Sequence, residues 1–345
     1  MKGLRCKPVV TGDFMQPEMC EKWQKADFDK HFDVLNEAGI DTFVLQWTGE
    51  VERGGIKTIH HKSEGLAKDT ALHLPEYEEY PDMLGNLLAS AKDHKIGVFV
   101  GLPMIAGQEW WDRFFVDEKW QDTYCDFTAR FAREIYNTYY EEYKEAFAGF
   151  YWTQEMYTHN DNWEEDWARM LNKDIAVLNE LNPDLPMLMS PFFSAAYRST
   201  PERIEAQYRN MLRLTNFRKG DIMCPQDSYG AFDFSIRYVE EGLAAIARAV
   251  EEDGRLRFWV NCENFGNESM RGDNHANDLA PGDISRFVAQ LHIAAAYAEK
   301  MITFSYSHHY NPNVPSDRHP ARAERGRLNH KAYVQYAARF ACWDD

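Results

Sequence analysis

The chain has 345 residues, a hydrophobic content of 44% and a formal net charge of −17 at pH 7. Its composition is typical of a soluble globular protein, and the excess of acidic groups disfavours nucleic acids and anionic membranes as partners. Because there is no run of about 18 apolar residues and no signal-peptide core in residues 1–7, we expect no membrane span and a cytoplasmic location, unless a secretion signal has been removed.

In chain order, eight short segments have the composition of buried β-strands, and longer stretches with helical spacing separate them. Each segment is apolar nearly throughout, which is typical of strands that are covered on both faces. The predicted strands are residues 8–14, 42–47, 96–102, 149–154, 187–191, 222–226, 258–262 and 302–307.

The stretches between these strands have amphipathic helix patterns. Phe28, Phe32 and Leu35 recur at helical spacing after the first strand, and Gly39 is expected to end that helix. The same pattern recurs after each later strand. The further helices are expected near residues 84–91, 118–145, 163–181, 201–215, 236–252, 284–299 and 330–340.

Strict alternation of strand and helix predicts parallel strands joined by helical crossovers, and eight such units close a barrel. An open doubly wound sheet is the rival fold, but no glycine-rich nucleotide motif follows the first strand. No linker or low-complexity tract divides the chain. The sequence therefore predicts an α/β fold of the (β/α)8 TIM-barrel class, with residues 1–345 as a single domain and long loops after the strands.

The predicted loops differ in length between the two ends of the barrel. Those that follow strands are long, at residues 47–76, 103–117, 264–282 and 308–329, whereas loops before strands are short. In barrel enzymes the loops after the strands build the active site. We therefore expect the functional face at the carboxyl ends of the strands. His60 and His61, within the first of these long loops, are expected to be exposed to solvent.

Two glutamates lie at the ends of different predicted strands, Glu155 after the fourth and Glu263 after the seventh. Cleavage of a glycosidic bond needs one carboxyl that holds a proton and one that is ionised. A rigid barrel can hold two such groups at a fixed separation, so the pair predicts a glycoside hydrolase that acts on a carbohydrate substrate. Candidate substrate-binding residues near the strand ends are Asp13, Gln46, Trp47, Gln154, Gln226, Asp227, Tyr229, Asn261, Tyr306, His308 and His309, and further aromatic candidates are Trp110, Trp111, Phe193 and Tyr197.

The sequence contains no cysteine pair with metal-ligand spacing, and Cys224 and Cys262 fall inside predicted core strands. We therefore expect no metal and no cofactor. Two alternatives to a hydrolase stay open. One is a metal-dependent sugar isomerase or epimerase whose ligands are Glu155, Asp227, Glu263 and a histidine of the eighth strand. The other is a barrel that binds carbohydrate without catalysis.

Several segments together resemble a known bacterial family. The segments GDF at 12–14, LNEAGIDTFVLQ at 35–46, GFYWTQE at 149–155, CPQD at 224–227 and WVNCENF at 259–265 resemble the glycoside-hydrolase-like barrels catalogued as domain of unknown function 4434. The two glutamates also resemble those of retaining barrel glycosidases. That resemblance implies that Glu155 is the acid/base and Glu263 the nucleophile. In those glycosidases an asparagine usually precedes the acid/base, where this chain has Gln154.

Overall fold

The computed structural model describes residues 3–106, 117–157, 164–193, 199–232, 234–267, 279–313 and 320–341. Eight parallel strands close into a barrel in the order β1-β14-β11-β10-β9-β8-β6-β2. Every predicted strand segment contains or overlaps one of them, so the TIM-barrel prediction is confirmed. The barrel strands are β1 (Gly12–Met15), β2 (Thr42–Leu45), β6 (Gly97–Gly101), β8 (Phe147–Trp152), β9 (Met187–Met189), β10 (Ile222–Met223), β11 (Arg257–Glu263) and β14 (Lys300–Phe304).

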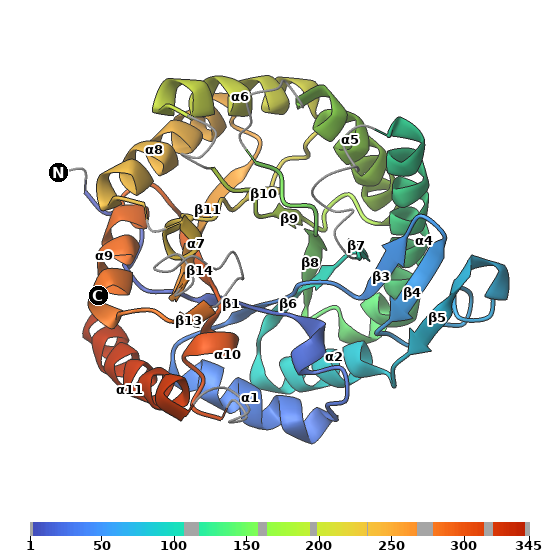
Figure 1. Ribbon diagram of the computed structural model, residues 1–345, viewed down its shortest axis with the longest axis horizontal. Coiled ribbons are helices and arrows are strands. Elements are labelled where there is room, and N and C mark those ends of the chain that lie inside the picture. The colour runs from blue at the N-terminus through green and yellow to red at the C-terminus, as the bar shows by residue number, and fades with distance from the viewer. Residues whose placement is uncertain are drawn as a thin grey trace.

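Helices surround the barrel and cover its outer face (Figure 1). Several begin at a side chain that accepts a backbone N–H of the first turn, as Asp82, Thr200 and Ser235 do. None of the described helices is long and apolar enough to cross a membrane. The outer helices are α1 (Lys25–Glu37), α2 (Met83–His94), α4 (Glu118–Tyr143), α5 (Glu164–Leu181), α6 (Pro201–Leu214), α8 (Ile236–Asp253), α9 (Ile284–Ala294) and α11 (Pro320–Ala337), with short 3-10 helices at Pro17–Met19, Thr70–Leu72 and Ala338–Phe340.

The inside of the barrel is filled by one side chain or two from each strand. Because successive side chains of a strand point to opposite faces, this inner layer fixes which residues further along point into the barrel mouth. Cys224 is part of the layer, and Cys262 is buried in the core outside it, as a packing role predicts. The layer consists of Phe14, Val44, Phe99, Tyr151, Leu188, Ile222, Cys224, Trp259 and Ile302.

The segment after β2 and the short strand after β6 form a small sheet of their own. This sheet projects beside α4 (Figure 1) and contains β3 (Gly49–Glu52), β4 (Gly55–Ile59), β5 (His73–Glu79) and β7 (Met104–Ile105). Our expectation that His60 and His61 are exposed is wrong, because they are only 2% and 0% exposed. His60 stacks on Tyr80, and His61 lies 3.6 Å from the carboxylate of Glu134 on α4. Contacts with β4 and Tyr80 therefore cover the His60 ring, and contacts with α4 cover the His61 ring.

The chain after β14 also differs from the prediction. The predicted strand 302–307 ends at Phe304, and the helical turn α10 (Tyr306–His309) replaces its last residues. The carboxylate of Asp13 accepts the backbone N–H groups of Tyr306 and Ser307, at 2.6 and 2.8 Å, which favours a helical turn over a strand at this point. The last helix begins at Pro320, ten residues before its predicted start, and proline suits the first turn of a helix.

A buried carboxyl group lies between the barrel and α5 and leads to a stability prediction. Asp174 is 1% exposed and accepts a 2.9 Å hydrogen bond from the indole of Trp152. Burial raises the pKa of Asp174 to about 7. Because this folded-state pKa lies above the unfolded value, its stabilising contribution is present in acid and is lost as pH rises through about 7.

We therefore expect Asp174→Asn to be more stable than the wild type at pH 9, on the order of 2–4 kcal/mol, and nearly equal to it at pH 4. Urea unfolding at both pH values measures this difference. Asp126→Asn, a substitution at an exposed position of α4, controls for the change in net charge. An Asp174→Asn protein that is less stable than the wild type at pH 9 would contradict the account.

Candidate active site

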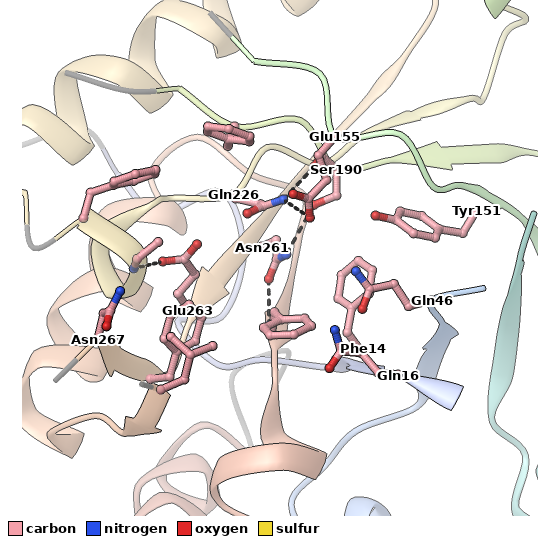
Figure 2. Close-up of a pocket in the computed structure, with 16 residues that line it drawn as sticks. Phe14, Gln16, Gln46, Tyr151, Glu155, Ser190, Gln226, Asn261, Glu263 and Asn267 are labelled. Carbon is pink, nitrogen blue, oxygen red and sulfur yellow. Dashed lines mark hydrogen bonds between the residues drawn. The ribbon is translucent and has the colours of Figure 1, made fainter. Parts of the chain in front are cut away.

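A cavity of about 350 Å³ opens at the carboxyl ends of the barrel strands. Figure 2 shows Glu155, Gln226 and Asn261 in its wall, with Glu263 on one side and Gln16 and Gln46 on the other. The lining residues are Phe14, Gln16, Gln46, Tyr151, Glu155, Ser190, Phe192, Gln226, Ala231, Phe232, Asn261, Glu263, Phe265, Asn267, Leu279 and Phe304.

Alternation along the strands explains most of this set. Phe14, Val44, Cys224 and Trp259 point into the barrel, so the residues two or four further along point into its mouth. These further residues are Gln16, Gln46, Gln226, Asn261 and Glu263, and all of them line the cavity. Of the residues predicted from the sequence, the structure therefore brings together Glu155, Glu263, Gln46, Gln226 and Asn261.

Glu155 lies just beyond β8 and is held by one neighbouring amide. Nε2 of Gln226 donates to Oε1 of Glu155 at 3.1 Å and to the backbone carbonyl of Ser190 at 2.9 Å. Burial raises the pKa of Glu155 to about 7, although the hydrogen bond from Gln226 opposes the shift. This carboxyl group can therefore keep its proton in weakly acidic solution and lose it in weakly alkaline solution.

Glu263 ends β11 and is 2% exposed. Its Oε2 accepts a 2.8 Å hydrogen bond from the backbone N–H of Ala231 in the short helix α7 (Tyr229–Phe232). This helix approaches closely because residue 230 is glycine, where a Cβ atom would lie 3.1 Å from Oε2 of Glu263 and 2.4 Å from the carbonyl oxygen of Phe265. The contact fixes the carboxyl group in the cavity wall.

Asp227 lies behind Glu263, outside the barrel mouth. Its Oδ1 accepts the backbone N–H groups of Tyr229 and Glu263, both at 3.2 Å, and its Oδ2 accepts the side-chain amide of Gln290 at 2.5 Å. Burial raises the pKa of both Asp227 and Glu263, and repulsion from Asp227 raises that of Glu263 further. Asp227 accepts more hydrogen bonds than Glu263 does, and these stabilise its ionised form, so we assign the larger rise in pKa to Glu263.

Three other predicted binding residues face away from the cavity. Asp13 caps α10, and Gln154 donates to the hydroxyl of Tyr124 at 2.8 Å. Trp47 is buried, with 3% of its surface exposed. None of the three is among the described residues that line the cavity. Asp13 and Trp47 stand at odd steps from the inward-facing Phe14 and Val44, which places their side chains on the outer face.

The remaining predicted residues form a layer behind the cavity wall. Tyr229 lies under the guanidinium of Arg286, and the Tyr306 hydroxyl is 2.6 Å from Nδ1 of His330. His308 accepts the backbone N–H of Gln16 at Nε2, and the His309 ring packs on Phe265 at 5.5 Å between centroids. His308 and His309 are both buried. Both therefore support lining residues, and neither is among the described residues of the cavity wall.

Several residues of the described wall were not predicted from the sequence. Gln16 and Ser190 could have been found by counting in steps of two from Phe14 and Leu188. Asn267 and Leu279 come from a two-stranded hairpin, β12 (Phe265–Asn267) and β13 (Leu279–Pro281), for which the sequence had no comparable signal. Phe193, the remaining aromatic candidate in a described range, is fully buried. The candidates Trp110, Trp111 and Tyr197 lie outside the described residues.

The ligand set proposed for a metal-dependent isomerase does not converge. Asp227 lies behind the cavity wall, where its carboxylate binds Gln290 and two backbone N–H groups. Nε2 of His308 accepts the backbone N–H of Gln16. Within the part of the chain that the structure describes, no three His, Cys, Asp or Glu side chains gather as a metal site would require. These contacts do not favour the isomerase alternative.

The contact between Asp227 and Glu263 leads to a pH prediction. In Asp227→Asn, the oxygen of the new amide can still accept both backbone N–H groups. Gln290 can turn its amide so that Oε1, which has no described hydrogen-bond partner, accepts from the Asn nitrogen, although this turn breaks the 3.1 Å hydrogen bond from Nε2 to the backbone carbonyl of Glu263. The variant therefore removes the charge and keeps the two backbone hydrogen bonds to residue 227. The pKa of Glu263 should fall, because the repulsion that raises it is gone.

For any activity that requires ionised Glu263, the acid limb of the pH–rate profile of Asp227→Asn should move at least about 0.5 unit toward lower pH. Initial rates between pH 4 and pH 10 measure the shift. Gln290→Glu, which adds a carboxyl group beside Asp227, should move the same limb toward higher pH. Unchanged acid limbs in both variants would show that Asp227 does not govern the protonation of Glu263.

The chain shares its fold with several solved structures. A Bacteroides thetaiotaomicron VPI-5482 protein described as "a putative alpha-L-fucosidase" has a TM-score of 0.69 and 18% identity, covering 97% of this chain and 94% of its own. An endo-1,4-beta-D-mannanase from Thermotoga petrophila RKU-1 has a TM-score of 0.55 and 12% identity, with coverage of 94% and 99%. At these identities the likeness shows a common barrel fold.

An endoglucanase also shares the fold, with a TM-score of 0.51, 11% identity and coverage of 96% of this chain and 98% of its own. No curated protein has a matching sequence. The family described as domain of unknown function 4434 matches residues 10–317, which is most of the chain. The resemblance inferred from the sequence segments is thus confirmed, and the chain belongs to the domain of unknown function 4434 family.

Proposed function

We propose that this protein is a glycoside hydrolase whose catalytic residues are Glu155 and Glu263. The observation that carries the proposal is that these glutamates, one just beyond β8 and the other at the end of β11, line one cavity at the barrel mouth. The same wall has amide side chains that can hydrogen-bond to hydroxyl groups, and aromatic rings on which the C–H face of a sugar can pack. A carboxyl pair in such surroundings is what cleavage of a glycosidic bond requires.

In the first step, the carboxylate of Glu263 attacks the anomeric carbon while the bond to the departing oxygen breaks. Glu155 gives its proton to that oxygen, and a glycosyl ester of Glu263 forms. In the second step, Glu155 takes a proton from water. The oxygen of that water attacks the anomeric carbon and releases the Glu263 carboxylate, so the sugar keeps its anomeric configuration.

The surroundings of Glu155 suit its role as the acid, whereas burial and the neighbouring Asp227 raise the pKa of Glu263 and oppose the ionised form that its role needs. Burial raises the pKa of Glu155 to about 7, so it is a proton donor near neutral pH. The N–H of Ala231 donates to Glu263, which orients its carboxylate and opposes the rise in the pKa of Glu263 that burial and Asp227 cause. Positive charge that develops at the anomeric carbon favours the same ionised form. We place Gln46, Gln226 and Asn261 around the sugar, because they share this cavity with the glutamates.

The solved structures with the same fold add a second line of support. The mannanase and the endoglucanase both carry names of enzymes that cleave glycosidic bonds. Their fold presents strand ends at one face, as the fold of this chain does. For the present protein, a carbohydrate substrate is inferred from the residues of the cavity. The names of the mannanase and the endoglucanase support that inference.

The test is sugar release from a panel of oligosaccharides and of aryl α- and β-glycosides. Wild type is compared with the double variant Glu155→Gln/Glu263→Gln, which keeps the side-chain shapes and removes both carboxyl groups. We expect release by the wild type that falls below detection in the double variant. Release by both proteins at the same rate, or release by neither from any substrate, would overturn the proposal.

A further inference from the structure

The described wall of the cavity carries carboxyl groups and no cationic side chain. Glu155 and Glu263 supply its two carboxyl groups, and among the described lining residues there is no lysine, arginine or histidine. The remaining polar side chains are uncharged groups that can both donate and accept hydrogen bonds. They are Gln16, Gln46, Tyr151, Ser190, Gln226, Asn261 and Asn267.

The guanidinium of Arg286 contacts lining residues from behind the wall. It donates to the backbone carbonyls of Glu263 and Phe265, at 3.2 and 2.5 Å, and lies 4.9 Å above the ring of Tyr229. Asp227 adds a third carboxyl group directly behind Glu263. A bound anion would therefore meet carboxyl groups in a partly desolvated site where repulsion between like charges is strong.

Among the described lining residues, Gln46 has a buried side-chain oxygen that lacks a hydrogen-bond partner. It is 8% exposed and lines the cavity, and its Oε1 atom has no hydrogen-bond partner among the described residues. In Figure 2 its amide points into the pocket from the side opposite Glu263. Oε1 of Gln46 is covered in this conformation, so a ligand hydroxyl group can pair with it only after the amide turns. Such a pair gains affinity because a buried acceptor without a partner is unfavourable.

We propose that the cavity takes an uncharged sugar unit and rejects sugars that carry a carboxylate, sulfate or phosphate, with Gln46 as a specificity-determining contact to a hydroxyl group. This inference rests on the proposed function, since it names the substrate class of the same site. The amides match the paired donor and acceptor character of hydroxyl groups, and the carboxyl groups of Glu155 and Glu263 oppose a negative charge.

The test compares kcat/KM for matched aryl glycosides that differ only at the sixth carbon, such as glucoside against glucuronide and galactoside against galacturonide. We expect the wild type to prefer the uncharged member by at least about 100-fold. Gln46→Lys, which places a cation in the wall, should reduce that ratio by at least about tenfold. Gln335→Lys, at an exposed position of α11, adds the same charge elsewhere and should leave the ratio unchanged.

A wild type that prefers the uronides, or that treats both members alike, would overturn the inference while leaving the hydrolase proposal intact. If no glycoside is cleaved, the hydrolase proposal fails, and calorimetry with methyl glucoside, methyl galactoside and the corresponding methyl uronides still decides the inference. Binding of an uncharged sugar that Gln46→Leu weakens at least about tenfold would support it. Stronger binding of a uronide, or binding of none of them, would refute it.

Discussion

Replacement of Glu263 by glutamine is expected to lower kcat/KM by at least about 10⁴-fold on every glycoside that the wild type cleaves. An amide cannot form the glycosyl ester, whatever the leaving group. The fold should persist, because the glutamine oxygen can still accept the N–H of Ala231 that now binds Oε2 of Glu263. Glu299→Gln, which changes an exposed glutamate paired with Arg257, is the matched control and should keep full activity.

A second variant separates loss of the nucleophile from general damage. Glu263→Ala leaves room beside the anomeric carbon, so added azide should restore cleavage of an activated aryl glycoside and form a glycosyl azide of inverted configuration. Product analysis by NMR distinguishes this azide from free sugar. Activity of Glu263→Gln within tenfold of the wild type would remove Glu263 from the reaction.

Replacement of Glu155 by glutamine is expected to produce a loss that depends on the leaving group. For alkyl glycosides and oligosaccharides, whose departing oxygen needs a proton, kcat/KM should fall at least about 10³-fold. For a 2,4-dinitrophenyl glycoside, whose phenolate departs without a proton, kcat/KM should fall by less than about tenfold. The hydrogen bond from Gln226 can persist to the new amide oxygen, so the side chain should stay in place.

The pH–rate profile is a second test of the assignment of Glu155 as the acid. Because burial raises the pKa of Glu155 to about 7, the activity of the wild type on alkyl glycosides should fall as pH rises above that value. In Glu155→Gln the alkaline limb should disappear. A loss of equal size for all leaving groups, with an unchanged alkaline limb, would show that Glu155 is not the acid.

Much of the barrel could be predicted from the sequence because buried parallel strands have a distinctive composition. The segment around Val98–Val100 and the segment around Phe258–Val260 are apolar on both faces, and both are barrel strands. Glutamates that follow such strands were expected at the mouth, and Glu155 and Glu263 are found there. A strand end thus indicates the right region of the molecule.

The position of a residue at the end of a strand does not show whether its side chain points into the barrel mouth or to the outer face. Asp13 and Gln46 were predicted on equal grounds, yet Gln46 lines the cavity and Asp13 caps α10. The difference follows from alternation, since Gln46 lies two residues from the inward-facing Val44 and Asp13 lies next to the inward-facing Phe14. Alternation counted from the inward-facing residues would have predicted Gln46 in the cavity wall and Asp13 on the outer face.

Long-range contacts explain what the sequence could not predict. His60 and His61 lie in a polar segment, but β4 and Tyr80 lie against His60, and helix α4 lies against His61. The end of β14 becomes a helical turn because Asp13, almost 300 residues earlier in the chain, accepts its N–H groups. Neither contact has a local signal in the sequence.

The most direct test of the account is covalent labelling with an activated 2-deoxy-2-fluoro glycoside of a sugar that the protein cleaves. Fluorine slows hydrolysis of the glycosyl ester, so the intermediate should accumulate and be located by mass spectrometry of proteolytic peptides. We expect one sugar on Glu263 and none on the Glu263→Gln variant. A label on Glu155 or Asp227, or steady turnover without any labelled protein, would contradict Glu263 as the nucleophile.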